Sequence, residues 1–287
     1  MLGASGAVQV AVLAVLFLTG AAIGSFLNVV IFRLPRSESL VHPRSRCLSC
    51  GETLGIADLV PVFSYIALRG RCRHCGRSYS PRYMLVELAT GLAAVGAWHL
   101  LGPTPEGLLS FIIVCCLVVV FFVDLDHYII PDEAVALIAA SGVVLDVLAL
   151  VQRGRSVAVV YHEQLSSGPG HEVVLPASVV GMAMGAGVFV AIAFVAERVF
   201  RRPGMGWGDV KLAAGMGAVL GPGYEFFTFF LLAVLIGALV GLVTMALGKR
   251  GRRDYLPFGP MLAVAGVVTL YFGDVVTPLV MSRFMLG

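Results

Sequence analysis

The chain has 287 residues, of which 59% are hydrophobic and only 13% are charged. Soluble domains carry about twice that share of charged residues, so the composition excludes an ordinary water-soluble domain. We predict an all-α polytopic membrane protein, and the net charge of +3 gives no reason to expect nucleic acid as a partner.

Long apolar runs predict the transmembrane helices, because a helix needs about 20 residues to cross a bilayer. Counting these runs gives about eight crossings. They lie at residues 7–32, 83–101, 108–123, 133–151, 177–197, 208–221, 224–247 and 257–280.

The first run, 7–32, is followed rather than preceded by positive charge, which indicates a retained anchor and not a cleaved secretory signal. Positive residues near span ends stay in the cytoplasm. In the predicted order only Arg153, Arg155 and Arg283 of the basic residues fall outside. We therefore expect residues 33–82 to be cytoplasmic and both termini to face out, with the basic insertion lying against anionic lipid headgroups.

Residues 33–82 contain two Cys-x-x-Cys pairs, separated by 21 residues, whose members are Cys47, Cys50, Cys72 and Cys75. Four thiolates suit tetrahedral zinc, and an insertion of this size has too small a core to fold without such help. The pattern predicts a structural zinc site, with a redox role or unpaired thiols as alternatives. His74 lies within the second pair, but four cysteines already complete the metal's coordination.

The third and sixth runs each adjoin an aspartate, Asp124 in Phe-Val-Asp-Leu-Asp-His and Asp209 in Gly-Trp-Gly-Asp-Val-Lys. Ionisable groups at membrane depth are costly and usually mark function. Two carboxyl groups can share one proton, so that one activates water while the other polarises a carbonyl. The non-catalytic alternative is that each aspartate is an interfacial carboxylate paired with Arg or Lys.

The predicted topology places both aspartates at the cytoplasmic ends of their helices, where they can meet. The sixth run extends only from Asp209 to Gly221, so it is short or recessed and gives water a route to Asp209. Gly206 and Gly208 allow another chain, such as an extended substrate strand, to approach closely.

Other polar residues have several possible roles. Asp126 is expected to be solvated or bound to Arg, Asp132 to favour a helix N-terminus, and Lys211 to extend toward the interface or pair with phosphate. Glu87 suits an Arg-pairing or helix-start role as well as substrate handling. Cys115 and Cys116 are assigned no chemistry, and the outer loop 152–176, with His162 and His171, is not expected to bind metal.

Several motifs together resemble one family, the bacterial type IV prepilin peptidases, which are GxGD-type membrane aspartic proteases that also methylate their product. The matching segments are Gly24–Pro35, the two Cys-x-x-Cys pairs, Tyr83–Gly91, Asp124–Asp132 and Gly206–Leu212.

The resemblance implies that Asp124 and Asp209 are catalytic and that Cys47, Cys50, Cys72 and Cys75 bind zinc. It implies removal of a basic leader from type IV prepilins or pseudopilin precursors at the cytoplasmic face of the bacterial inner membrane. N-methylation by S-adenosylmethionine is implied by the resemblance alone.

The expected organisation follows from both arguments. Residues 1–32 form the first transmembrane helix, 33–82 a cytoplasmic zinc-binding insertion, and 83–287 a membrane-embedded aspartic peptidase domain of about seven helices. Two alternatives are a GxGD protease that cuts within membrane helices and a non-catalytic transporter or scaffold whose carboxylates bind cations or protons.

Overall fold

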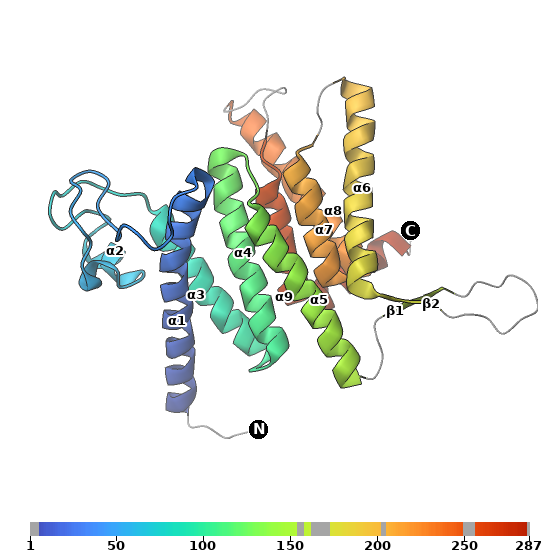
Figure 1. The fold of residues 1–287 in the computed structure, drawn as a ribbon, viewed down its shortest axis with the longest axis horizontal. Helices are drawn as coiled ribbons and strands as arrows, with labels where there is room; N and C mark the ends of the chain where they lie inside the picture. Colours follow the sequence, from blue (N-terminus) through green and yellow to red (C-terminus); the bar gives the residue numbers. More distant parts are fainter. Residues whose placement is uncertain (1–5, 154–157, 162–172, 202–204, 249–255, 286–287) are drawn as a thin grey trace, which may run out of the picture. The chain divides into compact units, whose positions relative to one another are not determined.

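The computed structural model describes residues 6–153, 158–161, 173–201, 205–248 and 256–285. Its contacts divide the chain into two compact units, Met1–Val123 and Asp124–Gly287. Each is described separately below and can be followed by colour in Figure 1.

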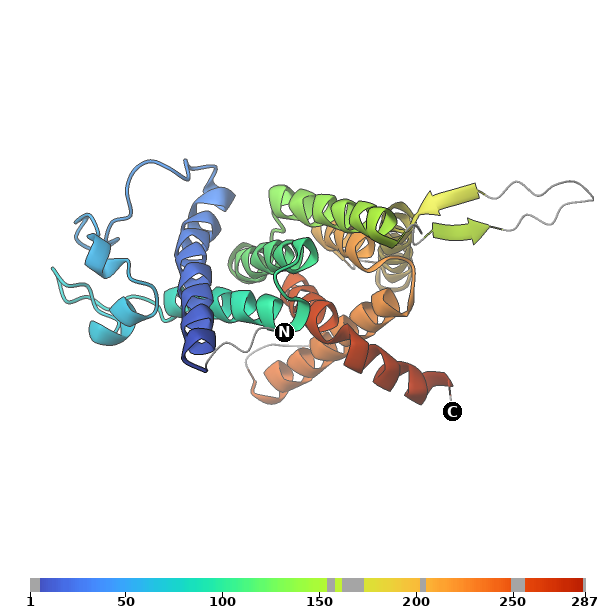
Figure 2. The ribbon, with the colours of Figure 1, turned by 90° about the horizontal axis from the view of Figure 1, so that it is seen from below.

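The first unit is built on the packing of α1 (Gly6–Arg33) against α3 (Arg82–Leu101). Small residues allow the close approach of these helices, which Figure 2 shows crossing each other. A Cβ atom on Gly24 would lie only 2.0 Å from Oγ1 of Thr90. The side chain of Asn28 also donates a hydrogen bond of 3.0 Å to the carbonyl of Tyr83. The two helices are therefore fixed by both shape and polar contact.

The first part of α4 (Pro105–His127) completes the apolar core of this unit. The core unites residues of α1, α3 and α4, namely Leu27, Ile31, Val86, Cys115, Val119 and Val123. Cys115 and Cys116 are both buried, as expected for cysteines that act as small apolar residues.

The insertion between α1 and α3 contains three short helices, η1 (Leu34–Arg36), η2 (Ile56–Asp58) and α2 (Phe63–Ala67). Its remaining chain forms turns and isolated bridges. The insertion has no large apolar core. Among its residues, all of which the structure describes, Cys72 is the one buried hydrophobic residue. Its stability must come from other contacts.

The second unit is helical and centres on α7 (Trp207–Leu220), which packs against α5 (Asp132–Arg153) and α6 (Ala177–Phe200). Figure 1 shows α7 between these two helices. A Cβ atom on Gly181 of α6 would lie 2.0 Å from the carbonyl oxygen of Gly217 of α7, so the two backbones nearly touch.

Two further helices, α8 (Tyr224–Ala246) and α9 (Gly259–Met285), complete the second unit and pack against each other. The backbone of α9 is non-helical at Phe272, which divides it by a kink. Between α5 and α6, β1 (Ala158–Tyr161) pairs antiparallel with β2 (Val173–Pro176). This hairpin was not predicted, and His162 and His171 lie outside the described residues.

The prediction of a polytopic helical membrane protein is confirmed. Seven of the described helices are long and apolar enough to cross a membrane. The remaining predicted crossing, the sixth in the chain, is α7, whose 14 residues extend only about 21 Å. It is short, as the sequence indicated.

Candidate active site and candidate metal centre

Asp209 lies in the first turn of α7, in a position created by the preceding glycines. Its Oδ2 accepts a hydrogen bond of 3.2 Å from the backbone N–H of Gly206, which precedes the helix in an extended conformation. A carboxylate here receives a backbone donor and the favourable field of the helix N-terminus. Only 4% of Asp209 is exposed, so these interactions replace most of its contact with solvent.

Asp124 lies in the last turn of α4, because this helix continues to His127 and does not end at residue 123 as predicted. Its Oδ2 accepts a hydrogen bond of 2.9 Å from the backbone N–H of Gly259, the first residue of α9. A Cβ atom on Gly259 would lie 2.6 Å from that same oxygen. Only a glycine therefore allows this approach without displacing the carboxylate, which is 5% exposed.

The second unit brings Asp124 and Asp209 close enough to repel each other electrostatically. Two carboxyl groups at such range can share one proton, so that one is protonated while the other is ionised. This state supplies a proton acceptor and a proton donor in one place. It is the arrangement that hydrolysis by a carboxyl pair requires.

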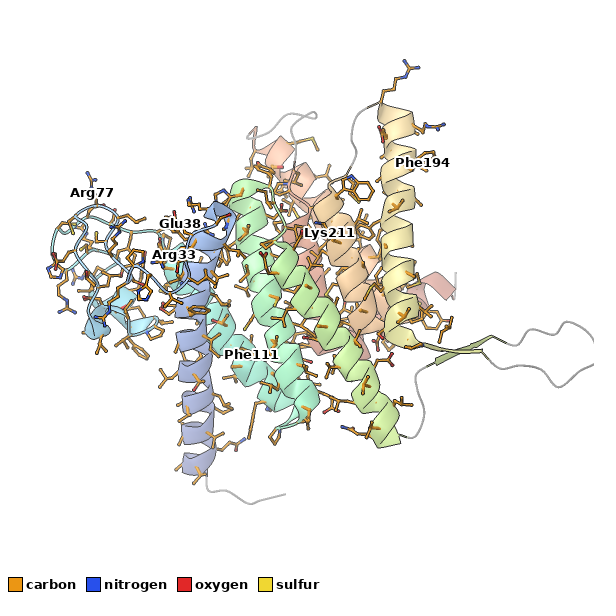
Figure 3. All side chains as sticks on the ribbon, viewed as in Figure 1. Arg33, Glu38, Arg77, Phe111, Phe194 and Lys211 are labelled. Atoms are coloured by element: carbon orange, nitrogen blue, oxygen red, sulfur yellow. The ribbon has the colours of Figure 1, made fainter. Side chains whose placement is uncertain are left out.

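Neighbouring residues of the two motifs support the local backbone. The missing Cβ of Gly208 would lie 3.0 Å from the side chain of Ile130, so this glycine packs against the turn that follows α4. Lys211 of α7, labelled in Figure 3, forms an ion pair with the exposed Asp132 at the start of α5. Lys211 thus pairs with a carboxylate of its own chain, and Asp126 is exposed.

Glu87 belongs to the other unit and is buried in α3. Its Oε2 accepts a hydrogen bond of 2.7 Å from the backbone N–H of Val62 in the insertion. This contact joins α3 to the residue that directly precedes α2, and it was not among the roles considered for Glu87.

The four predicted zinc ligands also come together. The Sγ atoms of Cys47, Cys50, Cys72 and Cys75 all lie within 4.8 Å of one another, and those of Cys47 and Cys75 are 3.9 Å apart. Zn–S bonds of about 2.3 Å place the sulfur atoms of a tetrahedron about 3.8 Å apart. The donor set and its spacing therefore fit zinc.

Equivalent turns form the two halves of this cysteine cluster. The N–H of Gly51 donates to the carbonyl of Cys47, and the N–H of Gly76 donates to that of Cys72, both at 2.9 Å. Both glycines have positive φ angles near 70°, which side chains disfavour. Backbone N–H groups, chiefly that of Cys50, lower the pKa of the Cys47 thiol to about 6, so its thiolate is accessible at neutral pH.

An ion pair joins the cluster to the rest of the insertion. The guanidinium of Arg73, in the second half, donates to Asp58 of η2 at 2.8 Å. This hydrogen bond lowers the pKa of Asp58 below its ordinary value. His74, by contrast, is exposed beside the cluster and adds no ligand to the group of four sulfur atoms.

Comparison with known proteins places both units in one family. Residues 18–100 match the model of the bacterial peptidase A24 N-terminal domain, and residues 111–242 match that of the type IV leader peptidase family. A prepilin leader peptidase/N-methyltransferase of Burkholderia pseudomallei is 33% identical, over 91% of this chain and 85% of its own length. The chain belongs to the type IV leader peptidase family.

Other relatives of the chain carry the same description. The protein of Aeromonas hydrophila is 32% identical over 94% of this chain and 93% of its own. That of Myxococcus xanthus is 36% identical over 83% of this chain and 65% of its own. No solved structure matches the chain.

The sequence analysis did not identify Gly259 as a member of the candidate active site. Its signal was the segment Pro257-Phe258-Gly259-Pro260, where a glycine between prolines opens the last apolar run. Proline suits the first turn of a helix, and glycine allows close backbone approach. The pattern predicts a tight helix start but does not identify the carboxylate that it contacts.

Proposed function

We propose that this protein removes the basic leader of type IV prepilins or pilin-like precursors by means of Asp124 and Asp209. The observation that carries the proposal is the pair itself: two buried carboxyl groups in mutual electrostatic range, each oriented by a glycine N–H. The relatives' names support the substrate and the reaction.

In the proposed mechanism the ionised carboxylate removes a proton from a water molecule, and the resulting hydroxide attacks the scissile carbonyl carbon. The protonated partner donates to the carbonyl oxygen. Collapse of the tetrahedral intermediate then breaks the C–N bond, and the leaving amine takes up a proton from the pair. Cleavage of each peptide bond consumes one water molecule.

The membrane placement is part of the same proposal. The protein is a multi-pass membrane protein, and we place it in the bacterial inner membrane with residues 33–82 and the aspartate pair at the cytoplasmic face. Arginines are concentrated in these residues, which favours retention on that side. A basic leader is retained on that side for the same reason.

The protein further methylates the newly exposed amine of the pilin, a step supported by the word N-methyltransferase in the names of its relatives. The proposed donor is S-adenosylmethionine, whose sulfonium methyl group is transferred to the amine with release of S-adenosylhomocysteine and a proton. Cys47, Cys50, Cys72 and Cys75 are the proposed ligands of a structural zinc ion. That ion would fix the fold of the insertion and takes no part in hydrolysis.

The proteolytic assignment is tested by Asp124→Asn and Asp209→Asn, each assayed in membranes on a prepilin substrate. General acid and base groups typically contribute about 10²–10⁴-fold, so each variant should lose at least that much cleavage. Asp126→Asn, two residues away on the same helix, is the matched control and should keep full activity. Wild-type cleavage by either variant of the pair would reject the assignment.

Methylation is measured in the same reaction by mass spectrometry of the processed pilin N-terminus. The wild-type protein with S-adenosylmethionine should add one methyl group. A product that is cleaved but never methylated would remove that half of the proposal and leave the protease assignment intact.

A further inference from the structure

Residues 56–66 of the insertion, which include η2 and α2, expose many apolar side chains. Ile56 is 89% exposed, Ile66 61% and Phe63 56%. Leu59 and Val60 of the same segment are also exposed. Large apolar groups concentrated in one exposed segment favour contact with a membrane or another protein.

The hydrogen bond between Val62 and Glu87 determines how deep this segment lies. α3 has 20 residues and is about 30 Å long, so its full length is needed to cross a hydrocarbon core of about 30 Å. Glu87 lies in its second turn, about 7–8 Å from the first residue, Arg82. The backbone of Val62 is therefore level with the first turns of a transmembrane span and not in the water above it.

A second set of contacts holds the segment at that level. The rings of Tyr65 and Tyr79 meet edge to face at 5.2 Å, and Tyr79 meets Tyr83 at 6.1 Å. Tyr83 belongs to the first turn of α3, so the three rings connect α2 to the end of the span. Tyrosine is enriched at the membrane–water interface, where its ring is apolar and its hydroxyl remains hydrated.

The charge of the insertion indicates which surface it meets. Nine arginines and three acidic residues lie between residues 33 and 82. Arg33 and Arg77, labelled in Figure 3, are two of the nine. Anionic lipid headgroups complement this excess of positive charge. They also lie beside the insertion if α1 and α3 cross the bilayer.

We propose that residues 56–66 are an interfacial anchor, whose apolar side chains enter the headgroup and acyl-chain boundary of an anionic bilayer. The carboxylate of Glu87 positions this anchor through the N–H of Val62. The anchor keeps the cysteine cluster close to the membrane, because Asp58 within it pairs with Arg73 of the cluster. This inference does not depend on the proposed peptidase chemistry.

The experiment uses the full-length protein in nanodiscs that contain phosphatidylglycerol with brominated acyl chains, which quench fluorescence on contact. An environment-sensitive fluorescent amino acid replaces Phe63 in one sample and Ile56 in a second. The matched control replaces Leu48, which is 71% exposed in the cysteine cluster but lies outside the segment. A thermal midpoint and a size-exclusion profile equal to those of the unlabelled protein verify that each labelled protein is folded.

Quenching at positions 63 and 56 should exceed that at position 48 at least twofold. A Glu87→Gln variant labelled at position 63 should show weaker quenching, because the amide accepts the N–H of Val62 less strongly. Equal quenching at all three positions would overturn the proposal. It would also be overturned if position 63 became shielded only after addition of a pilin-derived peptide, since the occupant would then be the substrate.

Discussion

At the scale of single residues, the two candidate catalytic aspartates are oriented in the same way. Each is buried, and each directs Oδ2 to the N–H of a glycine at the beginning of a helix, Gly206 for Asp209 and Gly259 for Asp124. The helices α7 and α9 thus orient the carboxyl groups through their main chains. Small changes at these glycines should alter activity without removing either acid.

The Gly259→Ala substitution tests directly whether Gly259 orients Asp124. The added methyl group would lie 2.6 Å from Oδ2 of Asp124 and must displace it. Misplacement of a reacting group by about 1 Å can cost about 100-fold in rate, and we expect a loss of kcat of that order. Gly273→Ala is the control in the same helix, because its added atom would meet nothing within 4 Å.

The measurement is the rate of prepilin cleavage at saturating substrate for both variants. A Gly259→Ala enzyme as fast as the Gly273→Ala enzyme would show that the position of Asp124 does not depend on this contact.

The sequence predicted the aspartates but not the glycine that orients one of them. Asp124 and Asp209 are conspicuous because carboxylates beside long apolar runs are rare. Gly259 is separated from Asp124 by most of the second unit, and only folding reveals which group its N–H meets. The catalytic role of the pair remains a prediction.

At the scale of elements, α7 depends on close contact with α6. The carbonyl oxygens of Gly181 and Gly217 would each lie about 2 Å from a Cβ atom on the other residue. Neither position accepts a side chain without separating the helices. The presence of glycine at both positions therefore sets the position of α7, and with it that of Asp209.

Gly181→Ala should consequently lower the stability of the second unit. Overpacking usually costs about 1–3 kcal/mol, which should appear as a reduced thermal midpoint in detergent. Gly187→Ala, in the same helix, has open space around its added atom and should leave the midpoint unchanged. Equal midpoints for both variants would contradict the close packing.

Removal of metal provides a second prediction for an element, the insertion. With four thiolates and little apolar core, residues 33–82 should require zinc to fold. We expect one zinc ion per purified wild-type chain and less in Cys72→Ser, accompanied by rapid proteolysis of the insertion. Cys116→Ser, a buried cysteine outside the cluster, serves as the control and should retain zinc. Metal analysis that finds no zinc in the wild-type protein would refute this prediction.

The elements were predictable to different degrees. Apolar length located the seven long helices and showed that α7 is short. The end of α4 was predicted too early, because the charged residues Asp124 and Asp126 mask a helix that continues to His127. The hairpin of β1 and β2 was missed, since its strands are only four residues long and flank a polar stretch.

At the scale of the whole molecule, the number of crossings determines which side each end of the chain faces. Seven long helices alone would place the two ends of the chain on opposite sides. Yet Gly259, at the start of α9, meets Asp124 at the end of α4, near Asp209 at the start of α7. α8 can return the chain to this level only if α7 has carried it away, so we expect α7 to cross the membrane despite its length.

The eight-crossing topology predicts the activity of reporter fusions at two sites. Alkaline phosphatase, which is active only outside the cytoplasm, should be inactive when fused after Leu247 at the end of α8. It should be active when fused after the last residue of the chain. The opposite pattern, or equal activity at the two sites, would reject the eight-crossing topology.

The positions of the arginines predicted the same topology from the sequence alone. They can be read from the chain without knowing how its helices pack. The domain division at residues 32 and 82 remains a prediction. The contacts group the structure differently, at Val123, where one helix contributes its first turns to one unit and its last turn to the other. Sequence patterns cannot reveal this boundary, since the helix is continuous across it.

The use of main-chain donors to orient both aspartates has a consequence for inhibitors. Every amino acid except proline retains its backbone N–H, so ordinary point mutations cannot delete the groups that orient the carboxylates. If the pair carries the proposed activity, a drug that binds the correctly oriented carboxylates would leave few routes to resistance at this site, because mutations that shift the pair would also impair the enzyme.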